Sequence, residues 1–88
     1  NPFNPSTTIH YQLPEQSQVH IAVYTVAGSK VADLVQSIQA PGYYVVTWHG
    51  TNMNSQQVAT GVYLYHVSIQ SRESGEHYNR THKMLLVK

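Results

Sequence analysis

The sequence predicts an all-β protein, an Ig-like antiparallel β-sandwich of about seven short strands. Short segments alternate between apolar and polar residues, as strands with one buried face do. Turn-forming residues separate these segments, and no segment has a persuasive helical period. The length of 88 residues predicts a single domain over 1–88.

The clearest alternation lies in residues 59–69, where Tyr63, Tyr65 and Val67 recur at every second position. Aromatic and β-branched residues dominate this segment, as is typical of strands. Gly61 opens it, and a polar run follows it. We therefore predict a central strand here.

The chain begins with an extended lead-in over 1–6, because two prolines and two asparagines exclude a helix there. Residues 7–13 and 19–23 then alternate, and their spacing predicts an antiparallel hairpin. A strand at 43–48 and a C-terminal strand at 78–88 complete the outline.

Residues 31–38 are ambiguous. Val31, Leu34 and Val35 follow a helical period, but the segment is too short for a convincing helix. A short strand or a single helical turn fits it.

Six residues are expected to have structural roles. Trp48 is the only tryptophan, and we predict that it fills the core together with Tyr63 and Tyr65. The glycines predicted to hold turns are Gly42, Gly50 and Gly61.

The composition excludes several kinds of partner. Five basic and four acidic residues give a net charge of +1, and no basic cluster suggests nucleic-acid binding. No stretch approaches the length of a membrane span. Cysteine is absent, so cysteine usage does not distinguish between an oxidising and a reducing compartment for this protein.

The six histidines invite a metal hypothesis. His10, His20 and His66 sit between apolar neighbours, so they should point away from the core. The sequence has no His-x-His or His-Glu-x-x-His motif, and no carboxylate stands beside these histidines. We predict solvent-facing histidines, with neither a metal site nor a cofactor.

A catalytic site is also not expected. The carboxylates are Glu15, Asp33, Glu73 and Glu76, and the last two share a turn where both should be solvated. There is no Gly-x-Ser-x-Gly motif and no cysteine nucleophile. The sequence therefore predicts that the protein is not an enzyme.

Aromatic residues could instead form a platform for sugar. The candidates are Tyr24, Tyr43, Tyr44, Trp48, Tyr63 and Tyr65. Strand parity divides these rings between faces, which favours core packing. A carbohydrate-binding module stays a third alternative.

Several blocks together resemble a known family. They are Asn-Pro-Phe-Asn-Pro at 1–5, Val-x-Ile-x-Val-Tyr at 19–24, Trp-x-Gly at 48–50, Ala-Thr-Gly-Val-Tyr at 59–63 and Lys-Met-x-x-x-Lys at 83–88. The chain looks like the type A C-terminal sorting domain of the type IX secretion system. That domain is similar to the Ig-like domain of the flagellar hook-capping protein.

This resemblance implies a non-catalytic domain that directs an exported protein across the outer membrane. The implied partners are the outer-membrane secretion machinery and, if there is one, a cargo domain that precedes this chain. The implied location is the extracellular space or the outer-membrane surface, reached through the periplasm. The implied sorting tail consists of Lys83, Met84, Leu85, Leu86, Val87 and Lys88.

The loop after Trp48 departs from the family pattern. His49 stands where an Asp is common, Ser55 where a Gly is expected, and Gln57 where a Pro is common. The loop also has fewer acidic residues than this loop usually has in the family. Calcium binding needs several carboxylate or carbonyl oxygens, so the sequence argues against a calcium site in this loop.

Both ends of the chain are candidates for sheet edges, which pair readily with other chains. An alternative function is therefore an extracellular structural or adhesive Ig-like subunit. Such a subunit would form homo-oligomers or filaments by pairing of edge strands.

Overall fold

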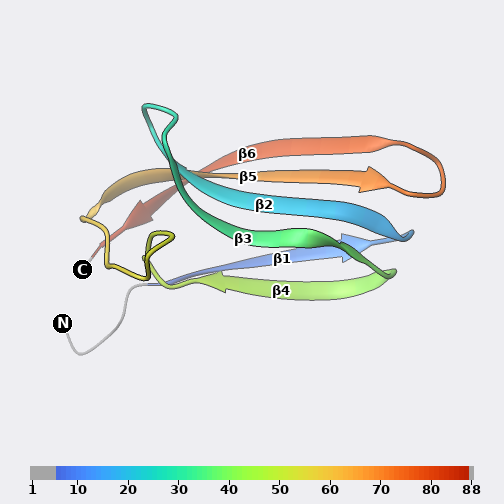
Figure 1. The fold of residues 1–88 in the computed structure, drawn as a ribbon, viewed down its shortest axis with the longest axis horizontal. Helices are drawn as coiled ribbons and strands as arrows, with labels where there is room; N and C mark the ends of the chain where they lie inside the picture. The colour runs from blue at the N-terminus through green and yellow to red at the C-terminus, as the bar shows by residue number, and fades with distance from the viewer. Residues whose placement is uncertain (1–5, 88) are drawn as a thin grey trace.

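The computed structural model describes residues 6–87, which form six antiparallel strands in two sheets (Figure 1). The strands are β1 (Thr7–Leu13), β2 (Ser17–Thr25), β3 (Lys30–Gln39), β4 (Gly42–Trp48), β5 (Gly61–Ser71) and β6 (His77–Leu86). The predicted all-β, Ig-like sandwich is confirmed, with six strands where about seven were expected. The predicted lead-in lies outside the described residues except for Ser6.

Within residues 6–87 every regular element is a strand, so this part of the chain contains no helix that could cross a membrane.

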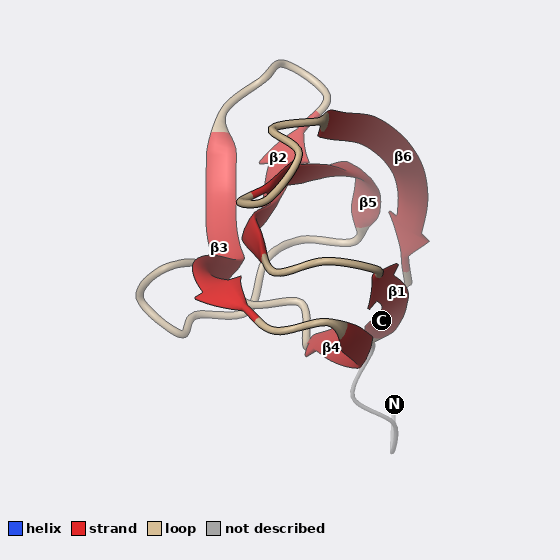
Figure 2. Cartoon of the chain, turned by 90° about the vertical axis from the view of Figure 1, so that its right-hand side faces the viewer, coloured by secondary structure: helices blue, strands red, loops and turns tan. Residues whose placement is uncertain are grey.

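The two sheets are unequal. β1 and β4 form a two-stranded sheet, and the other sheet has the order β3-β2-β5-β6. Figure 2 shows the sandwich end-on, with β1 and β4 beneath the larger sheet and β1 on the same side as β6. The smaller sheet therefore has two edges that carry no strand partner among the described residues.

The predicted hairpin between 7–13 and 19–23 is wrong. β1 pairs with β4, whereas β2 pairs with β3 and β5. Pro14 follows β1 and offers no N–H to extend a ladder. The link between β1 and β2 carries the chain from one sheet to the other. The alternation predicted both strands, but it carried no information about which strand each would join.

The ambiguous segment 31–38 belongs to β3, so the helical turn is excluded. Two β-bulges interrupt its pairing with β2, and the register skips Leu34 and Val31. A bulge adds a residue to one strand and breaks the period of two. Val31 and Ala32 are therefore both buried, which explains why neither strand nor helix periodicity fitted.

One part of the core surrounds Trp48, which is 1% exposed. Its ring meets Tyr63 edge-on at 5.3 Å between centroids, and its Nε1 donates to the carbonyl oxygen of Thr51 at 2.8 Å. The buried residues of this cluster are Val23, Val31, Ala32, Trp48, Tyr63 and Leu86. Tyr65 is half-buried and packs against it.

Gly50 closes the turn after Trp48 with a φ of +73°. This left-handed conformation costs a non-glycine residue free energy because of its Cβ. A Cβ on Gly50 would also lie 3.4 Å from both Cδ atoms of Leu86. The Trp-x-Gly turn therefore lets the end of β6 pack closely against the backbone.

The other part of the core joins the two sheets. Its buried residues are Ile9, Leu13, Val19, Ile21 and Val67, from β1, β2 and β5. The hydroxyl of Tyr11 adds a polar link between the sheets, because it donates to Oε1 of Gln39 at 2.6 Å. Burial raises the pKa of Tyr11, although the bond to Gln39 opposes this shift.

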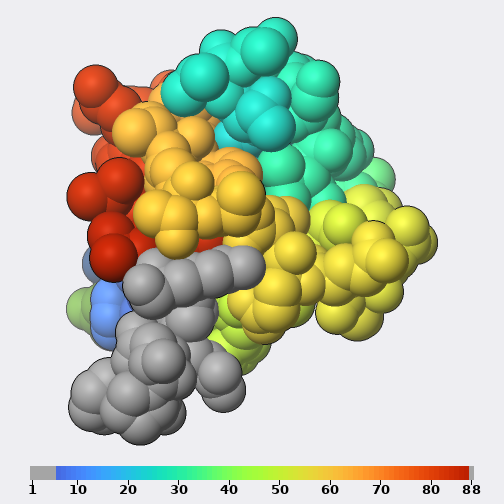
Figure 3. All heavy atoms as spheres, turned by 90° about the vertical axis from the view of Figure 1, so that its left-hand side faces the viewer, coloured from blue at the N-terminus to red at the C-terminus, as the bar shows by residue number. Residues whose placement is uncertain are grey.

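The β4–β5 loop lies at the end of the sandwich shown in Figure 3, the same end as the β2–β3 turn and the end of β6. The side-chain Oδ1 of Asn52 accepts the N–H groups of Asn54 and Gln56 at 2.9 and 3.0 Å. Ser55 has a φ of +62°, the one positive value among the described non-glycine residues. The loop is thus a tight turn organised by an asparagine.

Candidate functional site

The predicted sorting tail does not form one surface. Along β6 and beyond it, Leu86 is 2% exposed and belongs to the core, whereas Leu85 and Val87 are 65% and 57% exposed. Met84 packs against the Trp48 cluster, and Lys83 is exposed. Lys88 lies outside the described residues. The tail is therefore a strand with one covered face.

The remaining residues predicted to be structural are glycines at strand starts. Gly42 is the first residue of β4 and has a φ of +150°. Gly61 is the first residue of β5.

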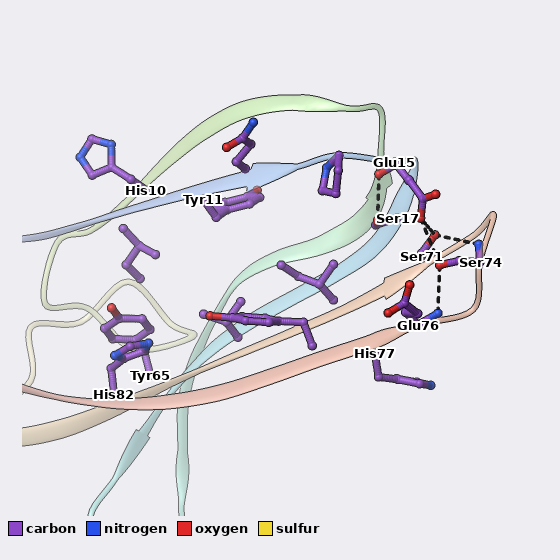
Figure 4. Close-up of a pocket in the computed structure, with 16 residues that line it drawn as sticks. His10, Tyr11, Glu15, Ser17, Tyr65, Ser71, Ser74, Glu76, His77 and His82 are labelled. Carbon is purple, nitrogen blue, oxygen red and sulfur yellow. Dashed lines mark hydrogen bonds between the residues drawn. The ribbon is translucent and has the colours of Figure 1, made fainter.

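A groove of about 520 Å³ lies between the free edge of β1 and the strands β5 and β6. Tyr65, Val67 and Ile69 of β5 line it, and Ile9 and Tyr11 of β1 face them. Figure 4 shows that these side chains leave an apolar gap between β1 and the larger sheet. We call this hollow the β1–β6 groove.

One end of the β1–β6 groove is lined by two carboxylates, those of Glu15 and Glu76 (Figure 4). Oε1 of Glu15 accepts hydrogen bonds from the hydroxyls of Ser71 at 2.6 Å and Ser74 at 3.1 Å. The Ser71 hydroxyl also accepts the N–H groups of Glu73 and Ser74 at 3.1 and 3.0 Å. The Glu15 carboxylate is therefore held in place by the β5–β6 turn.

Sequence reasoning placed Glu73 and Glu76 in one turn but missed Glu15. The β1–β2 link and the β5–β6 turn are far apart in the sequence. They meet because β1 ends, and β6 begins, at the same end of the sandwich (Figure 1). No local pattern could have shown this proximity.

Strand β6 carries an aromatic ring, imidazole rings and a guanidinium group. His82 stacks on Tyr65 at 4.9 Å between ring centroids. The guanidinium carbon of Arg80 lies 5.5 Å from the ring centroid of Tyr78. These pairs give the exposed strand β6 an ordered surface.

The fold brings a carboxylate to His20, although none stands beside it in the sequence. Its Nε2 lies 2.8 Å from Oδ1 of Asp33, and Nζ of Lys30 lies 3.1 Å from the same oxygen. The hydrogen bonds from His20 and Lys30 hold the pKa of Asp33 below its usual value of 3.8. The β-bulges in β3 bring Asp33 opposite β2, which is why strand parity missed the contact.

The other histidines do not gather. His10, His49 and His77 are exposed. Nδ1 of His66 is 2.8 Å from the Thr81 hydroxyl. No group of three or more histidine, aspartate or glutamate side chains within residues 6–87 is arranged to hold a metal ion.

The aromatic residues do not form one platform. Trp48 and Tyr63 are buried, whereas Tyr43 is 83% exposed. Tyr44 stacks on Tyr11 at 5.3 Å between centroids, and its hydroxyl donates to the carbonyl oxygen of Ala40 at 2.6 Å. The rings thus serve several separate packing contacts.

The fold is that of an Ig-like β-sandwich. Residues 4–74 match the FlgD Ig-like domain, and the chain belongs to this family. The match ends before β6 begins.

The crystal structure of FlgD from P. aeruginosa has a similar fold, with a TM-score of 0.61 and 23% sequence identity. The alignment covers 92% of this chain and 60% of that chain, so this chain spans less than two thirds of the length of that structure. No curated protein matches the chain.

These matches correct the predicted function. The family is that of the FlgD Ig-like domain, and not a type IX sorting family. The sorting role, the outer-membrane secretion machinery as partner and the adhesive or filament-forming alternative are therefore wrong. The sugar-binding alternative falls with them. The expected relation to the Ig-like domain of the hook-capping protein is confirmed, and that family is not one of enzymes.

Proposed function

We propose that this chain is a non-catalytic Ig-like module of a scaffold protein that works in assembly of the flagellar hook. The observation that carries the proposal is the match of residues 4–74 to the FlgD Ig-like domain. The similar fold of FlgD from P. aeruginosa supports it. In this role the module contributes binding surfaces and a rigid body.

The distribution of buried residues supports such a role. The sandwich holds its core around Trp48 and Val67, while β6 keeps most of its side chains exposed. The outward side chains Tyr43 and Val45 of β4 are 83% and 62% exposed. Large exposed apolar side chains of this kind favour contact with other proteins. The location outside the cytoplasm stays a prediction.

A chimera tests the proposal. Residues 1–88 replace the Ig-like domain of FlgD in a P. aeruginosa strain that lacks FlgD, and hooks are counted by electron microscopy. We expect hooks to form and swimming to return. FlgD with the domain deleted is the matched control. A chimera that accumulates to the level of intact FlgD but forms no hooks would contradict the assembly role.

A further inference from the structure

The inner face of β6 is uncovered. Tyr78, Arg80 and His82 lie opposite Ile69, Val67 and Tyr65 of β5 in the ladder. Residues directly opposite each other in a ladder share one face of the sheet. Val67 is 5% exposed, yet Arg80, its neighbour on β6, is exposed, and Tyr78 is 48% exposed. The smaller sheet ends at β1, which has no strand partner on its other edge among the described residues.

The free edge of β1 adjoins this uncovered face. β1 pairs with β4 on one side, and its other edge borders the β1–β6 groove. Paired strands lie about 4.8 Å apart, and stacked sheets lie about 10 Å apart. A third strand beside β1 would therefore sit over the groove and would lay alternate side chains against its lining from β5 and β6, such as Ile69 and Tyr78.

The groove also has a charge preference. Glu15 and Glu76 line the end towards which β1 runs. The ion pairs within residues 6–87 both belong to Asp33, so neither glutamate is neutralised by a described cation. The two serine hydroxyls keep Glu15 in place at this end. A basic residue of an incoming chain would complement these carboxylates.

The direction of the incoming strand follows from β1. Antiparallel pairs outnumber parallel pairs roughly two- to threefold. A strand antiparallel to β1 starts beside Glu15 and Glu76, where β1 ends. In this antiparallel arrangement its basic residue stands at its N-terminal end.

We propose that the β1–β6 groove binds an extended peptide segment of a partner protein as a third strand of the smaller sheet. The segment has a lysine or arginine at its N-terminal end, followed by apolar residues at alternate positions. Main-chain hydrogen bonds to β1 supply affinity, and the apolar floor and the carboxylates supply specificity. The proposal goes beyond the assembly role and does not depend on it, because it rests on the groove alone.

The test uses residues 1–88 and a synthetic peptide, Lys-Val-Thr-Val-Thr-Val, acetylated at its N-terminus and labelled with fluorescein at its C-terminus. Fluorescence anisotropy gives its affinity, and hydrogen exchange measured by NMR locates the bound strand. We expect slower exchange of alternate amides in β1 and tighter binding than for the reversed peptide, Val-Thr-Val-Thr-Val-Lys. Equal affinity for both peptides, or no protection in β1, would overturn the proposal.

Glu76→Gln tests the charge preference without touching the core, because Glu76 is exposed. We expect its affinity for the peptide to fall about two- to fivefold, as for a partly screened ion pair. Glu73→Gln is the matched control, since Glu73 does not line the groove. Equal losses of affinity in both variants would contradict the proposal that the basic residue of the peptide lies at the end of the groove that Glu76 lines.

Sedimentation of the chain without peptide gives a further check. A monomer is expected, because the proposed occupant is a different protein. A dimer in which β1 is already protected from exchange would mean that a second copy fills the groove, and the proposal would be wrong.

Discussion

The register of β6 can be tested with two leucines that are neighbours in the sequence. Leu86 is 2% exposed and Leu85 is 65% exposed. Leu86→Ala removes a side chain that packs in the Trp48 cluster and against Gly50. Leu85→Ala makes the same chemical change on the open face of the strand. The pair therefore isolates burial from side-chain type.

The expected magnitudes are far apart. A buried Leu→Ala change costs about 2–5 kcal/mol, because apolar contacts are lost and a cavity remains. A surface change away from special features costs less than about 0.5 kcal/mol. A domain of this length has a free energy of unfolding of roughly 4–13 kcal/mol. Leu86→Ala therefore removes a large share of the stability, and Leu85→Ala removes little.

Trp48 provides the assay, because its environment changes when the core opens. Urea unfolding followed by tryptophan fluorescence gives the midpoint, and thermal unfolding gives Tm. A loss of about 3 kcal/mol should lower Tm by roughly 12–24 °C for a domain of this size. Leu85→Ala should stay within a few degrees of the parent chain.

The opposite ranking would refute the reasoning. A slip of one residue in the β5–β6 ladder would bring Leu85 into the core and turn Leu86 outwards. Equal losses would mean that both faces of the strand end are covered. The reversed ranking would show that the pairing of Gly61 with Leu86 is wrong, and equal losses would show that the open face assigned to Leu85 is wrong.

Three further predictions concern local contacts. Ser55→Gly should raise stability by about 0.5–1 kcal/mol in urea unfolding, since glycine relieves the left-handed φ of +62°; a lower midpoint would contradict this. Ser71→Ala should cost about 1–3 kcal/mol, because the Glu15 carboxylate and two N–H groups lose a partner; an unchanged Tm would show that water replaces the hydroxyl. The pKa of Asp33 is lowered in the folded state from 3.8, so its contribution is present above that pH and is lost as pH falls through the folded pKa. Asp33→Asn should therefore flatten the fall in urea midpoint below about pH 4, and parallel profiles would exclude the His20 contact as the cause.

Alternation determined most of the strands. The segment around Tyr63 and Val67 forms β5 with the predicted face buried, because a strand must place every second residue on one side. The same reasoning located Trp48 at a strand end and in the core. The fold class followed from these local rules.

The resemblance to known sequences predicted the family correctly only in part. The expected similarity to the hook-capping Ig-like domain agrees with the match over 4–74. The finer assignment to a sorting domain, with Lys83–Lys88 as its signal, is wrong. The C-terminal run places Leu86 in the core and leaves Leu85 outside, so its sequence also reflects packing.

Only the tertiary structure determined which strands are neighbours. Period-two patterning shows which face of a strand is buried, but it carries no information about the partner strand. That is why the hairpin between 7–13 and 19–23 was predicted wrongly. The bulges that bury both Val31 and Ala32 depend on pairing with β2 in the same way.

The β1–β6 groove also depends on contacts between segments that are distant in the sequence. Glu15 and Glu76 become neighbours because strands from two sheets end together, and their sequence separation hides this contact. The sequence by itself determined the strands and their buried faces, since these depend on interactions a few residues long. The order of the strands, the open edge of β1 and the groove depend on contacts between distant segments, and only the folded chain decides those.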